Sequence, residues 1–354
     1  MSISPPEQTS LSPSDQTLYR PIASQVIQKK TAKKLEHISV CICTYLRPEM
    51  LVNLIEGLLN QKTYGRFNFS IIIVDNDPSG SAKEVVGNYI LQHKLQEDSI
   101  KIEYHHEQIK GLTYARNKSI ECSSGNYVAF IDDDEVPEPE WLYHLYKTLN
   151  DYQADAVFGT VLPKFEVDPP DWVRRQNFFY WRDVRTETGR EVGSAVTTNN
   201  ALVRRDLILL YDLKFDHDFA YTGGEDQAFF FNLLDSRKDA KYISCGKAVV
   251  HESITSERCE PEYIRRRHLL EGKGRVFGIY KFSHSNREII FMLINRFTQS
   301  SLRLLVLSLL SVLLFLISSD RAKKNYYKVF YHIGVLSALF NLSPYSDRES
   351  IGLL

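Results

Sequence analysis

The chain has 354 residues, 43% of them hydrophobic, which is enough for one large domain with appendages or for two modest ones. Its 43 Lys and Arg nearly cancel its 44 Asp and Glu, which argues against a nucleic-acid binder, since such proteins usually carry a basic excess. The five cysteines show no paired spacing beyond Cys41-x-Cys43, too little for a zinc site, and are interpreted as buried residues in a reducing compartment.

Residues 1–36 are expected to form a flexible polar tail. They are rich in Ser, Pro, Gln and Lys, and they contain no apolar run long enough for the core of a signal peptide. The β-branched apolar run at 38–43 then predicts a strand covered on both faces. It ends at Thr44-Tyr-Leu-Arg47, and Pro48 suits the first turn of a helix whose apolar residues recur every three or four positions.

Strands and helices continue to alternate as far as residue 131. We predict further strands at 69–74, 100–105 and 126–131, and helices near 81–95 and 112–122. Strands separated by helices predict a parallel α/β sheet, in which ligands bind beyond the carboxyl ends of the strands. The polar segments Thr44–Arg47, Asp75–Asp77 and Asp132–Glu135 each follow a strand, so they are expected to converge on one edge of the sheet.

The second half of the chain is more mixed. Strands are predicted near 154–162, 199–204 and 241–250, with an aromatic, Arg-rich loop at 169–190 and a helix that begins near Gly224.

Asp132, Asp133 and Asp134 form an acidic run at the end of a predicted strand. Adjacent carboxylates repel one another unless a cation or hydrogen-bond donors compensate them. Their hard oxygens suit Mg²⁺ or Mn²⁺, with the remaining ligands coming from water and a substrate diphosphate. The alternative is an acidic loop at the N-terminus of the following helix, where Glu135 and Glu138 would also be favoured.

Further polar residues have a functional and an ordinary interpretation. Asp75 is either a binding residue or a turn former, and Arg116 is either a bidentate phosphate ligand or a surface arginine. Glu225 and Asp226 follow two glycines at a helix N-terminus. One of them could be an ionised catalytic base, or the pair could simply be an acidic cap of the helix. His251 ends a strand and could complete a metal shell, contact a phosphate or be structural.

Five motifs occur in order: Val40-Cys-Ile-Cys-Thr-Tyr-Leu-Arg-Pro48, Ile73-Val-Asp-Asn-Asp77, Gly111 with Ala115-Arg-Asn117, Phe130-Ile-Asp-Asp-Asp-Glu135, and Gly224-Glu-Asp226. This order resembles glycosyltransferase family 2, and more narrowly the bacterial exopolysaccharide glycosyltransferases of the succinoglycan-biosynthesis type. The similarity covers residues 37–275. Each motif alone is unspecific, but five at this spacing are specific.

The resemblance implies a GT-A type α/β fold over 37–285, mainly parallel with helices on both faces, and inverting transfer from a nucleotide-sugar, with a UDP-sugar favoured. Its nucleotide-contacting positions correspond to Thr44, Tyr45, Arg47, Asp75, Arg116, Asn117 and Asp133. Its metal-binding positions correspond to Asp132 and Asp134, with His251 added as a possible ligand outside the family pattern. Its catalytic base lies in the pair Glu225 and Asp226, and we assign the role to Asp226.

The mechanism would need no protein nucleophile, only a base for the acceptor hydroxyl and a cation for the leaving diphosphate. No Gln-x-x-Arg-Trp is present, so the chain does not resemble the processive synthases. A nucleotidyltransferase is one alternative, although Thr44–Pro48 lacks the glycines of a phosphate loop. A membrane-tethered, non-catalytic binding module is another, although the acidic motifs are intact.

The C-terminal region, 286–354, is expected to associate with the cytoplasmic face of the membrane. The apolar run 302–317 is short for a crossing, which takes about 20 residues, and a second apolar stretch follows at 326–342. Since the catalytic domain is expected to be complete by about Arg275, these segments should have little core left to join. We hypothesise a helical hairpin that holds the site near a lipid-linked saccharide acceptor of surface polysaccharide synthesis. Basic residues at 265–275 and 321–324 would face anionic headgroups, or the former would bind phosphate. A buried helix pair is the alternative.

Overall fold

The structure, a computed structural model, describes residues 35–93, 100–180, 182–193, 196–220, 223–283, 285–315 and 319–340. The chain divides into two units, 1–34 and 35–354, and every described residue belongs to the second. The tail predicted for 1–36 therefore lies outside the described residues except for its last two, of which Glu36 already begins the first strand.

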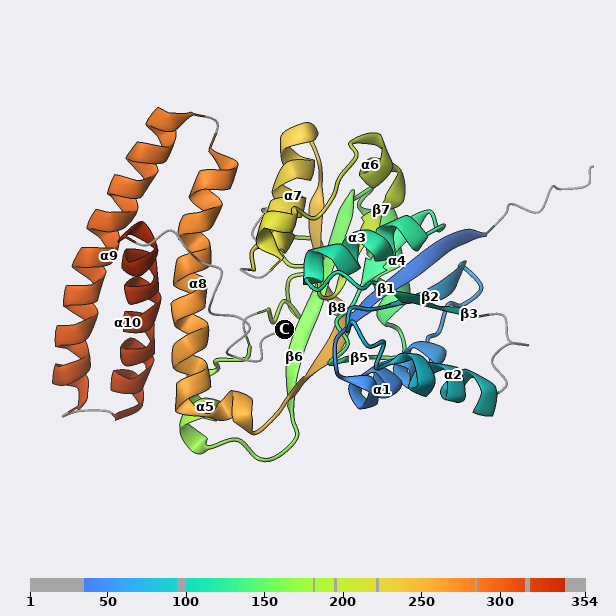
Figure 1. Ribbon diagram of the computed structural model, residues 1–354, viewed down its shortest axis with the longest axis horizontal. Helices are drawn as coiled ribbons and strands as arrows, with labels where there is room; N and C mark the ends of the chain where they lie inside the picture. The colour runs from blue at the N-terminus through green and yellow to red at the C-terminus, as the bar shows by residue number, and fades with distance from the viewer. Residues whose placement is uncertain are drawn as a thin grey trace, which may run out of the picture. The chain divides into compact units, whose positions relative to one another are not determined.

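The second unit is organised around an eight-stranded sheet with the order β3-β2-β1-β4-β7-β6-β8-β5 (Figure 1). The strands are β1 Glu36–Thr44, β2 Phe67–Asp75, β3 Lys101–His106, β4 Tyr127–Phe130, β5 Glu135–Pro137, β6 Ala156–Phe165, β7 Ala201–Arg204 and β8 Tyr242–Ile254. The first four predicted strands pair in parallel, as expected. β7 is antiparallel to both β4 and β6, and β8 is parallel to β6. The strand direction reverses from β4 to β7 and reverses again from β7 to β6. β6 and β8 therefore run in the same direction as β1 and β4, and β8 ends at the same edge of the sheet.

Ten helices are seen in the described part of the chain. They are α1 Pro48–Leu59, α2 Lys83–Gln92, α3 Leu112–Cys122, α4 Trp141–Asp151, α5 Asp171–Gln176, α6 Arg205–Leu210, α7 Glu225–Ser236, α8 Pro261–Phe282, α9 Asn286–Phe315 and α10 Ser319–Phe340. Two 3₁₀ turns, η1 His217–Phe219 and η2 Glu257–Cys259, complete the list. α8 was not predicted as a helix, because its Arg- and Lys-rich sequence shows no apolar stripe.

Helices cover both faces of the sheet, as predicted. Along β1, Val40 and Ile42 contribute to one core cluster, and Cys41 contributes to the other, because successive strand residues point to opposite faces. The first cluster includes buried residues of α1 and α4, such as Leu54 and Trp141. The second includes residues of α3, α6 and α7. The sheet is therefore buried on both faces, so a polar site is expected at the carboxyl ends of its strands.

The last three helices lie side by side, with α10 packed against both α8 and α9 (Figure 1). Gly272 of α8 and Gly334 of α10 face the partner backbone so closely that a Cβ at either would lie 2.1 Å from a carbonyl oxygen. Tyr327 of α10 stacks on Trp172 of α5, with ring centroids 5.7 Å apart, and joins a cluster that contains Ile254 of β8. The expectation that these segments have little core to join is thus wrong for α10.

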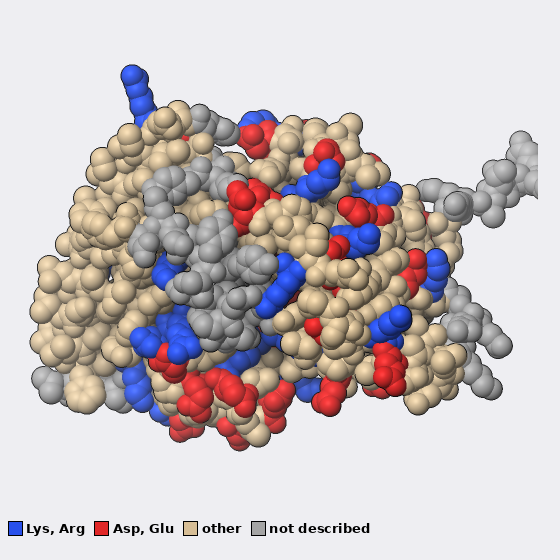
Figure 2. All heavy atoms as spheres, in the orientation of Figure 1, with Lys and Arg blue, Asp and Glu red and all other residues tan. Residues whose placement is uncertain are grey.

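α9 contrasts with α10 because most of its apolar side chains are exposed. Exposed apolar residues run from Ile290 to Phe315. By length and composition it is the one described helix that could cross a membrane, and 6% of its apolar stretch is buried. Figure 2 shows a broad surface over the C-terminal helices that carries almost no Lys, Arg, Asp or Glu.

Candidate active site

The carboxyl ends of β1, β4 and β8 surround a cleft of about 390 Å³. Thr44, Tyr45 and Arg47 line it from the segment after β1, and the acidic triplet Asp132–Asp134 lines it from the segment after β4. The end of β8 and the η2 turn close the opposite side. Of the three segments predicted to converge, those after β1 and β4 line the cleft, and the segment after β2 contributes Asn76.

The three aspartates of the triplet have different surroundings. The Asp133 side chain is 7% exposed and accepts hydrogen bonds from Thr44 Oγ1 at 2.8 Å and from Arg47 Nη1 at 3.1 Å. Asp134 is 13% exposed and has only long contacts, at 3.4 Å, with Arg47 and with Arg258. Asp132 is 45% exposed. Asp133 is therefore committed to the protein, whereas Asp132 and Asp134 retain free coordinating capacity.

The cleft disfavours the ionised forms of these carboxyls. Withdrawal from bulk water raises the pKa of Asp132 to about 8 against the opposing charge of Arg116, and the nearby Asp134 and Asp226 raise it further. Burial, followed by the charge of Glu252, raises the pKa of Asp134 to about 6. Such crowding is relieved by a divalent cation, and hard carboxylate oxygens suit Mg²⁺ or Mn²⁺. Among the described residues no group of three or more His, Cys, Asp or Glu is arranged around a metal. A cation held by Asp132 and Asp134 would have to take its remaining ligands from water and substrate.

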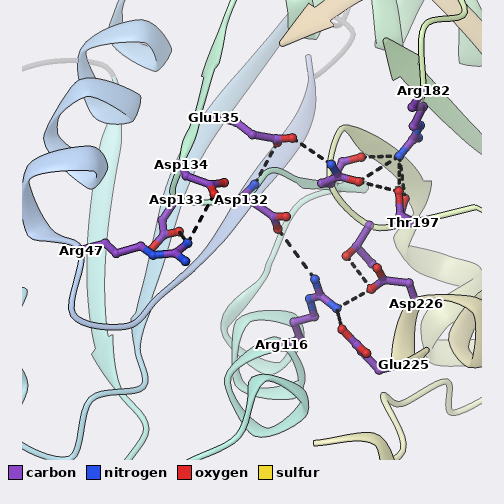
Figure 3. A network of polar contacts seen from close by, with 12 residues as sticks. Arg47, Arg116, Asp132, Asp133, Asp134, Glu135, Arg182, Thr197, Glu225 and Asp226 are labelled. Carbon is purple, nitrogen blue, oxygen red and sulfur yellow. Dashed lines mark hydrogen bonds and ion pairs between the residues drawn. The ribbon is translucent and has the colours of Figure 1, made fainter. Parts of the chain in front are cut away.

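Arg116 connects the triplet to the predicted base. Its 6% exposed side chain contacts Glu225 Oε1 at 2.8 Å, Asp226 Oδ1, and Asp132 Oδ1 at 3.7 Å (Figure 3). Asp226 also accepts a hydrogen bond from Thr198 Oγ1 at 2.7 Å. Burial and the charge of Glu225 raise the pKa of Asp226 despite Arg116. Arg116 lines the cleft, but its guanidinium is engaged by carboxylates and not by an open anion site.

Glycines set the approach of the two helices that carry these groups. Gly111 precedes α3 with φ 137°, and its N–H donates to Asn76 Oδ1 at 2.8 Å. Gly223 and Gly224 precede α7 with φ 73° and 98°, so the tight entry predicted there is present. It puts Glu225 and Asp226 in the first turn of α7.

Five predicted site residues are not among those that line the cleft. Glu225 and Asp226 lie behind Arg116 and reach the cleft through its guanidinium. The other three are Asp75, Asn117 and His251. Asp75 is fully buried and accepts hydrogen bonds from Ala82 N–H at 2.8 Å and Tyr104 Oη at 2.9 Å, so it shapes the loop after β2. Asn117 donates to the carbonyl of Phe215 at 2.9 Å and accepts from its N–H at 2.8 Å. The His251 ring contacts Glu138 Oε1 at 3.3 Å, away from the aspartates. The nucleotide and metal roles of these three residues stay predictions without a contact that supports them.

The wall formed by the end of β8 was not predicted from the sequence. Glu252, next to His251, lines the cleft together with Ser253 and Arg258. The rule that ligands bind at strand carboxyl ends would have identified this wall, had the direction of β8 been known. That direction depends on the two antiparallel steps at β7, which leave no mark in the sequence.

Comparison with known proteins agrees with the resemblance. The family model described as "Glycosyl transferase family 2" matches residues 39–209. The succinoglycan biosynthesis protein ExoM of Rhizobium meliloti is 30% identical over 246 residues, which cover 68% of this chain and 75% of that protein. A glucosyl-dolichyl phosphate glucuronosyltransferase of Haloferax volcanii is 32% identical over 151 residues, which cover 41% of this chain and 44% of that protein. Among solved structures, S. aureus TarS 1-349 in complex with UDP aligns with a TM-score of 0.48 and 16% identity over 85% of this chain and 90% of that one.

The matched region contains the parallel half of the sheet, the segment after β1 and the acidic triplet. The mixed α/β sheet with helices on both faces is the GT-A type of fold that the resemblance implied. Since ExoM is 30% identical and is matched over 75% of its own length, the chain belongs to glycosyl transferase family 2.

Proposed function

We propose that the protein is an inverting, metal-dependent glycosyltransferase that moves a sugar from a nucleotide-sugar, with a UDP-sugar favoured, to an acceptor hydroxyl. The observation that carries this proposal is the Arg116 bridge. It joins the cation-suited Asp132 to the pair Glu225 and Asp226 at one edge of the sheet. A cation site beside a buried carboxylate base is what direct displacement at an anomeric carbon requires.

The donor would enter from the side of β1. The Tyr45 ring, with Lys110 Nζ 5.3 Å from its centre, offers an aromatic face for a base and a cation for a phosphate. Arg47 is 36% exposed and available to a phosphate oxygen, and Asp133 would lie close to the nucleotide sugar. Mg²⁺ or Mn²⁺ bound by Asp132 and Asp134 would neutralise the charge that develops on the leaving diphosphate.

Asp226 would take the proton of the attacking hydroxyl. Its raised pKa makes it a better proton acceptor than an exposed aspartate. Thr198 and Arg116 both bind Oδ1, which fixes the carboxylate and leaves Oδ2 for the acceptor. Glu225, more deeply buried behind Arg116, would hold the guanidinium in place. The absence of Gln-x-x-Arg-Trp supports a single, non-processive transfer.

The acceptor would be a lipid-linked saccharide of surface polysaccharide synthesis at the cytoplasmic face of the membrane. Two observations support this proposal: the exposed apolar side of α9, and the similarity to a succinoglycan biosynthesis protein and to an enzyme named for a dolichyl phosphate acceptor.

A donor screen tests the proposed activity. Purified full-length protein with Mn²⁺ is incubated with a panel of nucleotide-sugars and with membrane lipid extract as the acceptor, and release of nucleoside diphosphate is measured. We expect release from one donor class, dependent on Mn²⁺ and abolished by EDTA. Release of pyrophosphate from a nucleoside triphosphate and a sugar phosphate would instead identify a nucleotidyltransferase. Release of neither product, with nucleotide binding intact, would favour a non-catalytic module.

A further inference from the structure

Arg258 is a charged residue of the cleft to which the proposed mechanism gives no role. It lies in the η2 turn immediately after β8, on the wall of the cleft opposite Arg47. Its side chain is 18% exposed. A position at the end of a parallel strand, beside the proposed cation site, is where a substrate group is expected.

Contacts hold both terminal nitrogens of the guanidinium. Nη2 contacts Glu252 Oε1 at 2.5 Å, and Nη1 donates to the carbonyl of Ser253 at 3.2 Å. The rings of Phe179 and Tyr263 each lie 5.9 Å from the guanidinium carbon. Its remaining charge contact, Nη1 with Asp134 Oδ2, is long at 3.4 Å, and Nε has no hydrogen-bond partner among the described residues. The group is thus held in place while part of its hydrogen-bonding capacity is unused.

Two guanidinium groups share the carboxylate of Asp134. Arg47 and Arg258 approach Oδ2 at 3.4 Å each, from the β1 and β8 sides of the cleft. A cation that binds Asp134 would occupy this carboxylate. Both guanidinium groups would then lose part of the negative charge that neutralises them. Arg47 would still keep Asp133 at 3.1 Å, and Arg258 would still keep Glu252, so neither would move far. An anion that arrives with the cation can satisfy both, and a diphosphate has the charge and the spaced oxygens to do so.

We therefore propose that Arg258 binds the diphosphate of the donor, on the side opposite Arg47, with Glu252 as the residue that positions its guanidinium. This inference rests on the proposed function, since it presupposes a nucleotide-sugar. It predicts that Arg258 recognises the β-phosphate and leaves the nucleoside and the α-phosphate to the β1 side of the cleft.

The test compares two nucleotides that differ by that phosphate. Binding of UDP and of UMP to full-length protein is measured by calorimetry with Mn²⁺, for the wild type, R258Q and R258K. The control is R190Q, which removes a 67% exposed arginine whose ion-pair partner among the described residues is Glu187. We expect R258Q to weaken UDP roughly tenfold to a hundredfold, the usual effect of losing a charge-assisted hydrogen-bond pair, and to change UMP less than about twofold. R258K should fall between, because it keeps the charge but not the planar fork.

Other outcomes would overturn the proposal. Equal losses for UDP and UMP, with a lowered unfolding temperature, would make Arg258 a structural residue; if R258Q does not fold, the UDP-to-UMP difference in R258K decides. Unchanged UDP affinity in R258Q, with loss of binding to vesicles that contain a polyprenyl phosphate, would assign the arginine to the acceptor. Wild-type protein that binds no nucleoside diphosphate at all would count against the proposed function itself, whereas UDP binding insensitive to R258Q counts against this inference alone.

Discussion

Three consecutive aspartates differ because of what faces each of them. Asp133 receives a hydroxyl and a guanidinium, so its charge is satisfied within the protein. Asp132 and Asp134 lie among other carboxylates and are protonated more easily than ordinary aspartates. A row of like charges is therefore divided into one member held by the protein and two whose proposed role is to bind a cation.

Asp134→Ala should abolish transfer while leaving the fold intact. The variant removes a cation ligand but breaks only two contacts of 3.4 Å. The measurement is the thermal shift that UDP with Mn²⁺ produces, which should be present in the wild type and lost in the variant. Asp151→Ala, an aspartate 51% exposed on α4, should retain both the shift and the activity. Full turnover by Asp134→Ala would remove the cation assignment.

Asp226→Asn tests the base. The amide preserves the shape of the side chain but cannot accept the proton, so turnover should fall by roughly two or more decades with donor affinity nearly unchanged. Glu225→Gln, which alters the neighbour held at 2.8 Å from Arg116, should cost less. If Glu225→Gln behaves as predicted for Asp226→Asn, and the latter stays active, the base has been assigned to the wrong carboxylate.

At the scale of elements, Asn200 links four parts of the fold behind the cleft. Its Oδ1 accepts from Trp141 Nε1 of α4 at 2.7 Å, and its Nδ2 donates to the carbonyls of Thr160 and Ala248, both at 2.8 Å. The residue is fully buried and has φ 58°, a conformation that asparagine tolerates better than most residues. A Cβ at Gly159 would lie 2.2 Å from its Oδ1, so the glycine is needed for this approach.

Asn200→Asp should therefore destabilise the protein. The change keeps size and acceptor but sets a carboxylate against two carbonyl oxygens, at an expected cost on the order of 2–4 kcal/mol. Chemical denaturation measures it, with Asn150→Asp as the control, since that exposed side chain donates to one helical carbonyl. A loss of less than about 0.5 kcal/mol at Asn200 would show that this junction is not a source of stability.

The same elements show what the sequence could predict and what it could not. The span predicted at 112–122 coincides with α3, because the regular alternation of strands and helices predicts a helix after the strand expected at 100–105. The segments that line the cleft after β1, β2 and β4 follow from strand ends alone. The wall at Glu252 and Arg258 depends on long-range pairing of β8 with β6, and the Arg116 bridge depends on how α3 meets α7. Neither relation has a local signature.

At the scale of the whole second unit, the C-terminal helices have two different roles. α10 is fastened to α8 through Gly272 and Gly334 and reaches the core through Tyr327. Truncation near Arg287 would remove this helix and expose Trp172 and its cluster, so loss of membrane binding in such a truncated protein would not be specific. Surface substitutions on α9 remove its exposed apolar side chains and leave the packing of α10 intact, so they test membrane binding alone.

Replacing Leu305, Leu309 and Val312 by Ser should release the protein from membranes. These side chains are 60%, 59% and 70% exposed, so the substitutions remove little packing. Their combined apolar area is worth several kcal/mol in contact with lipid, at about 0.8 kcal/mol per buried CH₂, which is enough to shift partitioning more than tenfold. The measurement is the fraction that sediments with membranes after a high-salt wash, which removes proteins held by charge alone. Leu209→Ser with Leu210→Ser, on α6 and 58% and 71% exposed, is the matched control and should sediment like the wild type.

Wild-type protein found wholly in the supernatant would contradict the anchor and leave the transferase chemistry untouched. A triple variant that still sediments would mean that a surface other than α9 holds the protein to the bilayer.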